Sequence, residues 1–433
     1  MSKIVKGGIF IVLFFSQALI AQNYYNSVYT RYLLGDLMNT GFSYNNSLGG
    51  SSLGLRPHNQ INYLNPASYT TQDSSSFLFQ AGFTGRSAKV FNNIDKDRTT
   101  NFNLDYLAIG FPVAKSIKMS VGAVPFSRAQ FNSREEVFSS EIGDTTRKDY
   151  TSFGGYNEVY IGGSIEIKKI ASIGFNASYL FGSVEKKNIT SLPGLLGSSA
   201  MVEQIRTTNI NDFYYKLGAQ LYPTYKEKHK VILGLTYDFK KNIDLKQTTN
   251  INRFNVNLNL MDQIDSIMVD SVNTSRMVYP SKIGIGLTYV YDNMLTVTAE
   301  YTEQDWSDNE IAVSEFKIGK YQSYRFGVDY TPVSFEKRLR VGYLKRMSYR
   351  AGAYYTKSYL IFNNDNIFSY GFSVGIGLPL KYMRKLFTGS ALNIGYQYGV
   401  RGTTDNGLIK EEIQVLTFGV TLHDFWFLKP KYD

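Results

Sequence analysis

The sequence of 433 residues has no cysteine, three histidines and two tryptophans. The absence of cysteine excludes a disulfide framework, a thiolate metal site and a lipid anchor on an N-terminal cysteine. The histidines, His58, His229 and His423, do not have the spacing of metal ligands. The sequence also lacks a glycine-rich phosphate loop, a calcium loop and a nucleic-acid recognition motif. We therefore expect no catalytic residue, metal, cofactor or nucleic-acid partner, and predict that the protein is not an enzyme.

Long apolar runs are equally scarce. The only one, Gly8 to Phe15, follows two lysines and precedes Ala21, which is the layout of a secretory signal peptide over residues 1–21. No other stretch is long and apolar enough for a transmembrane helix. After export, a chain of this kind can stay in a membrane only as a closed β-barrel. A mean hydropathy of -0.21 agrees with a barrel, because every second residue of a barrel strand is polar.

Aromatic residues and glycine are abundant, with 34 Tyr, 29 Phe and 37 Gly. Apolar and aromatic residues alternate with small or polar ones, as in residues 77–83, 173–181, 283–291 and 368–378. Such segments predict about fourteen strands, an even number that is typical of bacterial outer-membrane barrels. Their expected spans are 76–84, 102–113, 117–126, 156–168, 171–182, 211–222, 231–240, 281–291, 295–303, 321–331, 338–347, 367–378, 389–400 and 412–424.

The predicted connections alternate in length. Short ones are expected at residues 114–116, 169–170, 223–230, 292–294, 332–337 and 379–388, and long ones at 85–101, 127–155, 183–210, 241–280, 304–320, 348–366 and 401–411. Short periplasmic turns and longer outer loops produce this alternation in membrane barrels, whereas a soluble β-sandwich has no reason for it. We therefore predict an all-β membrane protein in the bacterial outer membrane, with an antiparallel barrel over residues 76–427 and a C-terminal tail of residues 428–433.

Residues 22–75 lie between the signal peptide and the first predicted strand. Their central stretch is rich in Gly, Asn and Pro and contains Gly49-Gly50 and Asn65-Pro66-Ala67. We interpret this region as a plug inside the barrel, where its backbone finds partners that lipid does not offer; a disordered periplasmic tail is the alternative. Glycines opposite the aromatic strand faces would leave room for a plug or a ligand, although barrel curvature alone also explains them. They are Gly284, Gly286, Gly371, Gly375, Gly377, Gly395 and Gly399.

The two motifs, placed after a signal peptide and before about fourteen strands, resemble the N-terminal hatch of FadL/TodX-type outer-membrane transporters. The motif match covers only the hatch, while the barrel pattern covers most of the chain. The resemblance implies a fourteen-stranded barrel with a hatch in its lumen. It also implies passive transport of long-chain fatty acids or other hydrophobic compounds.

Two expected outer loops, residues 183–210 and 241–280, would form the substrate-capture groove if the resemblance holds. They carry apolar clusters, and exposed apolar clusters often mark binding surfaces. Packing of the loops on each other is an alternative of equal weight. The candidate capture residues are Leu192, Leu195, Leu196, Met201, Leu260, Met261 and Ile264.

The third predicted strand contains Gly122 and Pro125. Proline cannot donate a hydrogen bond to a neighbouring strand. In the resembling family a kink in this strand opens the wall sideways, so we predict a lateral opening at Gly122 and Pro125. A plain strand end is the alternative.

Arginine is the best partner for a fatty-acid carboxylate because of its bidentate geometry. Arg56 in the plug is the leading candidate for such a contact. Arg86, Arg128 and Arg206 are candidates in the expected outer loops. Contact with solvent or with lipopolysaccharide is the alternative for these side chains.

The formal charge of +10 suits contact with outer-membrane lipid and lipopolysaccharide. The expected partners also include a hydrophobic small-molecule ligand. An alternative function is that of a structural or accessory subunit of a secretion or protein-assembly complex, which would dock other outer-membrane proteins through its outer loops. A nonspecific porin ranks below both, because a plug would close the channel.

Overall fold

The computed structural model describes residues 27–38, 41–91, 96–140, 144–192, 198–225, 228–257, 260–309, 316–333, 341–362, 364–380 and 389–425. The expected signal peptide and the expected C-terminal tail lie outside these residues. Among the described residues, no helix is both long and apolar enough to cross a bilayer.

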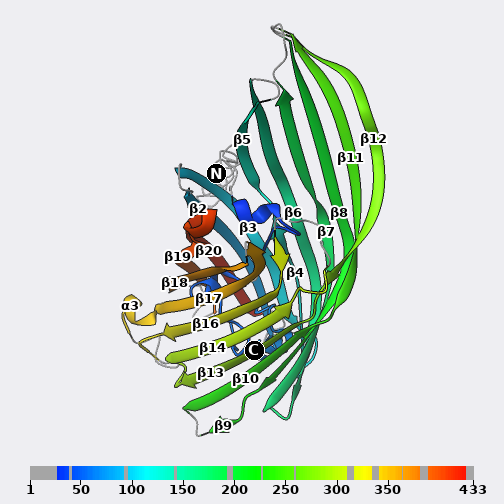
Figure 1. Cartoon of the computed structure of the whole chain (residues 1–433). Helices are drawn as coiled ribbons and strands as arrows, with labels where there is room; N and C mark the ends of the chain where they lie inside the picture. The colour runs from blue at the N-terminus through cyan, green and yellow to red at the C-terminus, as the bar shows by residue number, and fades with distance from the viewer. Residues whose placement is uncertain are drawn as a thin grey trace, which may run out of the picture.

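Fourteen of the described strands form a closed antiparallel barrel, which confirms the predicted fold (Figure 1). Each pairs with the next, and the last pairs with the first from Ser76↔Phe425 to Phe91↔Lys410. Closure pairs the backbone of each strand with its neighbours, except beyond the end of the β3–β4 ladder. The strands are β2 (Ser76–Phe91), β3 (Lys96–Pro112), β4 (Ile117–Arg128), β6 (Asp144–Ile167), β7 (Ala171–Leu192), β8 (Ser198–Leu221), β10 (His229–Asp238), β13 (Lys282–Tyr291), β14 (Leu295–Asp305), β16 (Lys320–Tyr330), β17 (Ser348–Phe362), β18 (Asp365–Pro379), β19 (Ala391–Arg401) and β20 (Lys410–Phe425).

Alternation along the strands sorts side chains between the two faces of the wall. On β13, Ile283 and Leu287 are 60% and 54% exposed on the outside, whereas the neighbouring Thr288 is fully buried inside. The outward belt continues around the barrel and includes Ile161, Ile173, Phe213, Leu235, Phe326, Phe372 and Leu416. A continuous belt of exposed apolar side chains is stable only against lipid. The chain is therefore a membrane-spanning β-barrel.

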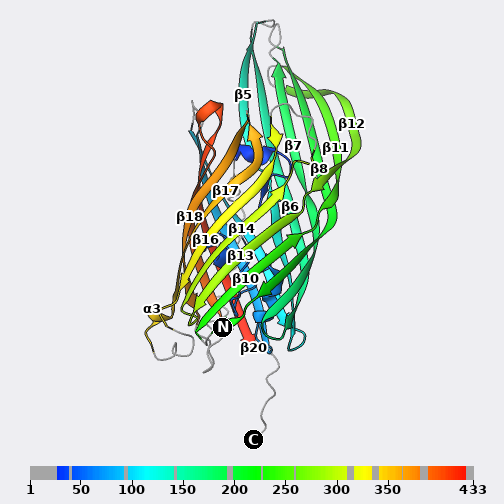
Figure 2. The same cartoon turned by 60° about the horizontal axis from the view of Figure 1, so that its bottom comes forward.

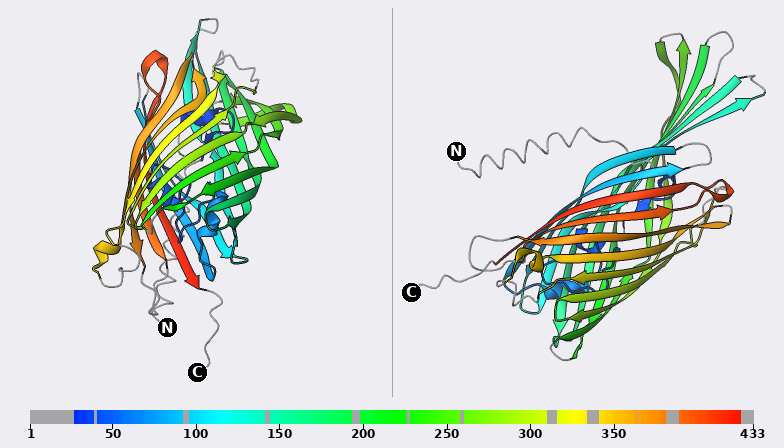
Figure 3. Two further views of the ribbon diagram at one scale, coloured as in Figure 1. Left: turned by 90° about the horizontal axis from the view of Figure 1, so that it is seen from below. Right: turned by 90° about the vertical axis from the view of Figure 1, so that its left-hand side faces the viewer.

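Beyond one end of the barrel an open sheet extends, which we call the upright sheet (Figures 2 and 3). Its order is β5 (Phe131–Ser139), the outer halves of β6, β7 and β8, then β11 (Lys241–Asn257) and β12 (Leu260–Tyr279). Within the described residues, β5 pairs only with β6 and β12 only with β11. The upright sheet therefore has two free edges, which the closed barrel lacks.

The prediction of long loops at residues 183–210 and 241–280 was wrong, because most of these residues lie on the paired strands β7, β8, β11 and β12. The cause is their composition. Thr, Asn, Gln and Lys face both sides of a sheet that stands in water, so no apolar alternation marks the strands.

The eleventh strand was also misplaced. It was predicted at residues 338–347, but the strand is β17, and the described part of the predicted span contains α3 (Tyr343–Arg346) instead. Two outward positions of β17 are filled by the small residues Ala351 and Ala353, which hide the apolar alternation. The connection before β17 is consequently long, and no long loop follows it, because β17 ends at Phe362 and β18 begins at Asp365.

The described residues between positions 27 and 72 lie inside the barrel in two parts. The strap (residues 27–38) contains η1 (Val28–Arg31) and β1 (Asp36–Leu37). The hatch segment (residues 41–72) contains α2 (Ser43–Asn46) and η2 (Pro66–Thr71), and most of its residues are buried. The remaining short elements are β9 (Thr224–Tyr225), β15 (Lys317–Ile318) and η5 (Asp405–Gly407).

Candidate functional site

Pairs of wall glycines on neighbouring strands receive the backbone of the hatch segment. Gly174 and Gly218 pair in register on β7 and β8, and a Cβ atom at either position would collide with the motif Asn65-Pro66-Ala67. Glycine is needed here because another backbone approaches the strand closely. Three further pairs in register hold other parts of the hatch segment: Gly234–Gly286 at Leu53 and Gly54, Gly327–Gly352 at Leu48, and Gly375–Gly395 at Ser47.

The inward glycines singled out from the sequence divide into two groups. A Cβ on Gly284, Gly286, Gly375 or Gly395 would meet the hatch segment. Gly371 and Gly399 instead make room for the ring of Tyr354, and Gly377 makes room for the guanidinium of Arg350. Both groups serve close packing rather than curvature alone.

The two hatch motifs have separate structural roles. Gly49 and Gly50 have φ angles of +69° and +82°, which other residues adopt only with strain. Asn65 accepts a hydrogen bond from the Ala67 amide at 3.2 Å and so caps η2, while Pro66 occupies the first turn. The Asn65 side chain also donates to the Leu53 carbonyl at 2.7 Å. The motif thus connects the middle of the hatch segment to its C-terminal part.

A buried carboxylate on the wall anchors the middle of the hatch segment. Glu300 of β14 accepts hydrogen bonds from the amides of Ser52 and Leu53 at 2.7 and 2.9 Å. Its other oxygen pairs with Arg325 at 3.2 Å, and Arg325 donates to the Gly50 carbonyl at 3.0 Å. Both charged side chains are less than a tenth exposed, so each depends on the other for compensation.

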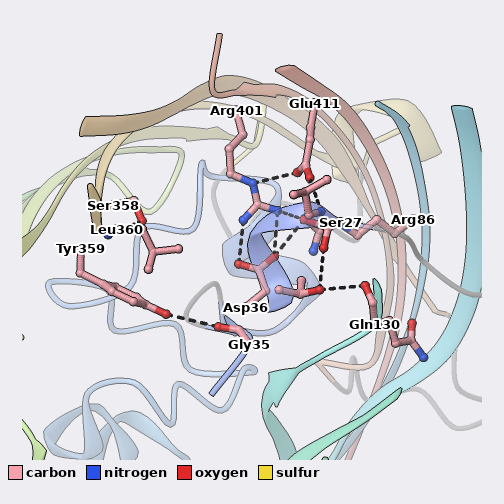
Figure 4. Close-up of polar contacts among 12 residues, drawn as sticks. Ser27, Gly35, Asp36, Arg86, Gln130, Ser358, Tyr359, Leu360, Arg401 and Glu411 are labelled. Atoms are coloured by element: carbon pink, nitrogen blue, oxygen red, sulfur yellow. Dashed lines mark hydrogen bonds and ion pairs between the residues drawn. The ribbon is translucent and has the colours of Figure 1, made fainter. Parts of the chain in front are cut away.

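Ion pairs hold the strap in the outer half of the lumen (Figure 4). Asp36 lies between Arg401 and Arg86, with N–O distances of 3.0 and 3.3 Å. Arg401 also pairs with Glu411 at 3.0 Å, and Glu411 accepts a hydrogen bond from the Ser27 hydroxyl at 2.7 Å. The two ends of the strap are thus fastened to the same charged cluster on β19 and β20.

Burial alone would raise the pKa of Asp36, but Arg401 and Arg86 outweigh it and hold that pKa below its usual value. A carboxylate with a lowered pKa stabilises the docked strap above the pKa of the free side chain. This contribution is lost as the pH falls through the lowered pKa. We therefore expect the strap to stay docked at neutral pH and to loosen only in acid, below about pH 4.

Asp36→Asn should loosen the strap at neutral pH. We expect the free energy of strap docking to become less favourable by about 2 kcal/mol, because the charged cluster is partly exposed. Trp306 reports on this, because its ring stacks on Tyr359, whose hydroxyl donates to the Gly35 carbonyl of the strap. In a Trp426→Phe background, we expect the fluorescence of Trp306 to change in Asp36→Asn at neutral pH and in the parent only in acid. Asp308→Asn removes an exposed carboxylate from a surface pair and serves as the control. Identical acid titrations of Asp36→Asn and its parent would contradict the assignment.

Between the strap and the wall lies a cavity of about 200 Å³, the upper cavity. Its lining combines polar and charged residues with apolar and aromatic ones. The charged residues are Asp36, Arg86, Asp105, Arg325 and Arg401, and the apolar and aromatic residues include Tyr29, Leu37, Met38, Tyr354, Tyr359, Leu360, Ile367, Ile413 and Val415. Several of these residues belong to a larger apolar cluster in which strap residues Tyr29 and Leu34 pack against Trp306 and Leu360 of the lumen. The outer lumen therefore has an apolar interior that the strap partly fills.

The wall has an interruption beside the upper cavity, which we call the seam. The β3–β4 ladder ends at Leu107↔Ala123, although both strands continue outward. Beyond this point β1 of the strap pairs with β4, with Leu37 opposite Ser127. The strap thus takes the place beside β4 that β3 leaves vacant.

The residues predicted to weaken the third strand lie at this interruption. Gly122 belongs to the last but one pair of the β3–β4 ladder, and Pro125 follows the last pair. A bulge follows between Pro125 and Ser127 in the ladder with β6. Proline removes a donor where the ladder stops, so the seam is a local weakness of the wall.

The opposite mouth of the barrel contains a larger cavity of about 710 Å³, the lower cavity, with a mainly polar lining. Arg56 lies here and donates to Ala67, Ser172, Gln220 and Thr70, and its guanidinium stacks on Tyr222 at 3.7 Å. Burial lowers the pKa of Arg56 to about 10. Its donors already have protein partners, so the geometry favours a structural role over the predicted carboxylate contact.

The candidate capture residues are distributed over the upright sheet. Met201 lies on β8 opposite Ser191, Leu192 ends β7, and Leu260, Met261 and Ile264 lie on β12. Leu195 and Leu196 lie outside the described residues. Their part in ligand capture stays a prediction.

Two of the expected loop arginines are in fact inside the barrel. Arg86 is on β2 and pairs with Asp36, and Arg128 ends β4 and donates to Asn157 at 3.0 Å. Arg206 is exposed on β8 of the upright sheet. Sequence reasoning included residues 27–38 in the plug but did not predict their pairing with β4 or their ion pairs with the wall. The one available signal was Asp36, a lone acid that follows the apolar Leu33 and Leu34.

Within the described part of the chain, no group of three or more acidic or histidine side chains is arranged to hold a metal ion.

The barrel is similar to solved structures of outer-membrane channels. CymD, a monoaromatic hydrocarbon channel, has a TM-score of 0.54 and 13% identity, covering 91% of this chain and 99% of its own. A Pseudomonas aeruginosa FadL homologue has a TM-score of 0.57 and 12% identity, covering 89% and 99%. The Pseudomonas putida toluene transporter TodX has a TM-score of 0.54 and 13% identity, covering 90% and 99%.

No curated protein matches the sequence significantly. A sequence model described as BamG matches residues 1–433.

Proposed function

The chain belongs to the BamG family, and we propose that it takes up small hydrophobic compounds through the outer membrane. The compound enters the outer lumen, occupies the upper cavity when the strap moves, and leaves sideways through the seam. The observation that carries this proposal is the early end of the β3–β4 ladder beside a cavity that is lined in part by apolar and aromatic side chains. Wall residues that face lipid lie on both sides of this exit, so the compound passes from one apolar environment to another.

The hatch segment makes a straight passage to the periplasm unfavourable. Below the upper cavity, Asp238 pairs with Lys282 at 3.1 Å, and Glu300 pairs with Arg325. The cavity among these charges measures only about 20 Å³. An apolar compound would lose its apolar contacts on crossing this charged layer, and it would have to displace the buried backbone of the hatch segment. The lateral exit therefore costs less free energy than the straight passage.

The size of the upper cavity favours compounds smaller than a long-chain fatty acid. Its volume of about 200 Å³ is below the range of roughly 300–1,000 Å³ that is usual for drug-sized ligands. Two structural relatives are described as a monoaromatic hydrocarbon channel and a toluene transporter, which agrees with a ligand of one aromatic ring. We propose substrates of that size.

A reversible disulfide between strap and wall tests the route. Leu37 and Ser127 are opposite each other in an antiparallel pair, where Cα atoms are about 4.5–5.5 Å apart, a distance that a disulfide spans. The chain has no other cysteine. We expect oxidised Leu37→Cys/Ser127→Cys to stop uptake of radiolabelled toluene by intact cells, and a reductant to restore it.

The two single-cysteine variants, treated in the same way, are the controls. Equal uptake by the oxidised and reduced double variant would contradict a route past the strap. Equal uptake by cells with and without the protein would contradict transport itself.

The upright sheet favours a second candidate function, the docking of other outer-membrane proteins. It stands outside the lipid belt, and Phe138 on its edge strand β5 is 67% exposed. A free edge is a template for pairing with another chain. Copurification of a stoichiometric protein set in mild detergent, unaffected by the strap disulfide, would favour this function. A bound hydrophobic molecule with no stoichiometric partner would favour uptake.

A further inference from the structure

Among the described residues, one carboxylate that lines the upper cavity has no ion pair. Asp105 of β3 lines both the upper cavity and a much smaller cavity beside Val124 and Pro125 at the seam. Within the described residues, its one hydrogen bond comes from the Thr84 hydroxyl at 3.0 Å. Asp105 therefore lies where a compound would pass from the lumen to the seam.

A β-bulge turns the Asp105 side chain inward. In the ladder with β2, Gly82 is opposite Tyr106 and Phe83 is opposite Leu104, so Asp105 is the extra residue. Leu104 is 49% exposed on the lipid side, while Tyr106 is buried in the lumen. Without the bulge, Asp105 and Tyr106 could not both face inward. Bulges of this kind are frequent next to functional sites, where they re-aim a side chain.

The other charged groups that line the upper cavity are matched by the protein itself. Arg86 and Arg401 share Asp36, Arg401 also pairs with Glu411, and Arg325 pairs with Glu300. Across the seam, Arg128 donates to Asn157 and to a backbone carbonyl. Asp105 has acceptor capacity left over. A carboxylate accepts hydrogen bonds only, so it selects a ligand that donates one.

From this placement we propose that Asp105 is a specificity-determining residue, and that the compound taken up is a small apolar molecule with one O–H or N–H donor. The apolar lining holds the hydrocarbon part, and Asp105 accepts the hydrogen bond as the molecule reaches the seam. An anionic ligand such as a fatty-acid carboxylate is disfavoured, because two carboxylates would face each other. This inference rests on the proposed uptake function and adds the class of ligand.

Three para-substituted toluenes test the class: p-cresol, p-xylene and p-toluate. The first two differ only in a hydroxyl in place of a methyl group, and the third carries a carboxylate. Binding to the purified full-length protein in detergent is measured by equilibrium dialysis. We expect p-cresol to bind at least about tenfold more tightly than p-xylene, as a hydrogen bond to a charged acceptor predicts, and p-toluate to bind most weakly.

Asp105→Ala should abolish the preference for p-cresol while p-xylene binding stays within about threefold, since an apolar ligand does not use the carboxylate. Asp105→Asn keeps an acceptor without charge and should retain part of the preference. Asp97→Asn, an exposed carboxylate on the same strand, is the matched control. For each variant, the shift in electrophoretic mobility on heating checks that the barrel is folded and closed.

The possible outcomes separate the two proposals. If p-xylene and p-cresol bind equally to the wild type, or if Asp105→Ala keeps the preference, the ligand class is wrong while hydrophobic binding stands. Tightest binding of p-toluate also overturns the class. If none of the three compounds binds to the folded protein, both the ligand class and the uptake of single-ring compounds are overturned.

Discussion

Glu300→Gln should release the middle of the hatch segment from the wall. The substitution keeps the shape of the side chain and one acceptor oxygen, but it leaves the buried Arg325 without its counter-charge. Removing one partner of a buried ion pair costs about 3–5 kcal/mol. We expect a loss of about 4 kcal/mol in the local stability of the hatch segment, because Ser52 and Leu53 lose a charged acceptor at the same time.

Hydrogen exchange of the Ser52 and Leu53 amides measures this loss directly. Protection should fall by more than two orders of magnitude, while the amides of the β13–β14 ladder keep their protection. Glu303→Gln, a more exposed carboxylate on the same strand, should change protection by less than about 1 kcal/mol. The double variant Glu300→Gln/Arg325→Met should recover part of the loss, since it buries no unpaired charge. Unchanged protection in Glu300→Gln would mean that the hatch segment does not depend on this pair.

The sequence predicted the barrel well because lipid imposes a strict pattern on a strand. Ile283, Ile285 and Leu287 alternate with glycine and threonine, and over ten residues this two-residue period clearly indicates a β-strand. Where the wall leaves the lipid the pattern ends, so β11 and β12 were taken for a loop. The misplacement of β17 has a related cause. Ala351 and Ala353 can face lipid, but they are too small to stand out as an apolar alternation in the sequence.

The inward glycines were visible in the sequence, but their grouping into registered pairs was not. Gly174 and Gly218 are adjacent only because β7 and β8 pair in one register, which depends on the turn between them and on the whole closed sheet. The bulge at Asp105 left a trace that could have been found. Outward residues occur at Phe102, Leu104 and then Leu107, a step of three where the period is two.

The attachment of the strap to the wall could not be predicted from the sequence for a different physical reason. Its ion pairs join Asp36 to Arg86 and Arg401, residues separated by 50 and 365 positions in the chain. Such pairs depend on closure of the barrel, when β2 and β20 meet. From the sequence alone, no ion-pair partner can be identified for an arginine on a predicted strand. Arg86 was therefore assigned to an outer loop.

Gly234→Ala should destabilise the protein by about 3 kcal/mol, the upper end of the range for overpacking. A Cβ atom at this position on β10 would collide with the backbone carbonyl of Leu53. The clash cannot be relieved by a rotamer change, because both sides are backbone. Gly286 on the paired strand touches Gly54 as well, so the hatch segment cannot slide sideways to make room. It must move away from the wall, and the contacts of Glu300 with Ser52 and Leu53 are lost with it.

Thermal unfolding in detergent and limited proteolysis of residues 41–72 measure the two parts of this effect. Gly163→Ala is the matched control, because its Cβ would be 3.8 Å from the nearest atom, an ordinary contact on the lipid side of β6. The control should unfold like the wild type and resist protease. Gly234→Ala should unfold at a lower temperature and expose the hatch segment to protease while the barrel remains closed. If both variants behave alike, the registered glycines reflect the curvature of the wall, and the hatch segment is held by its charged anchors alone.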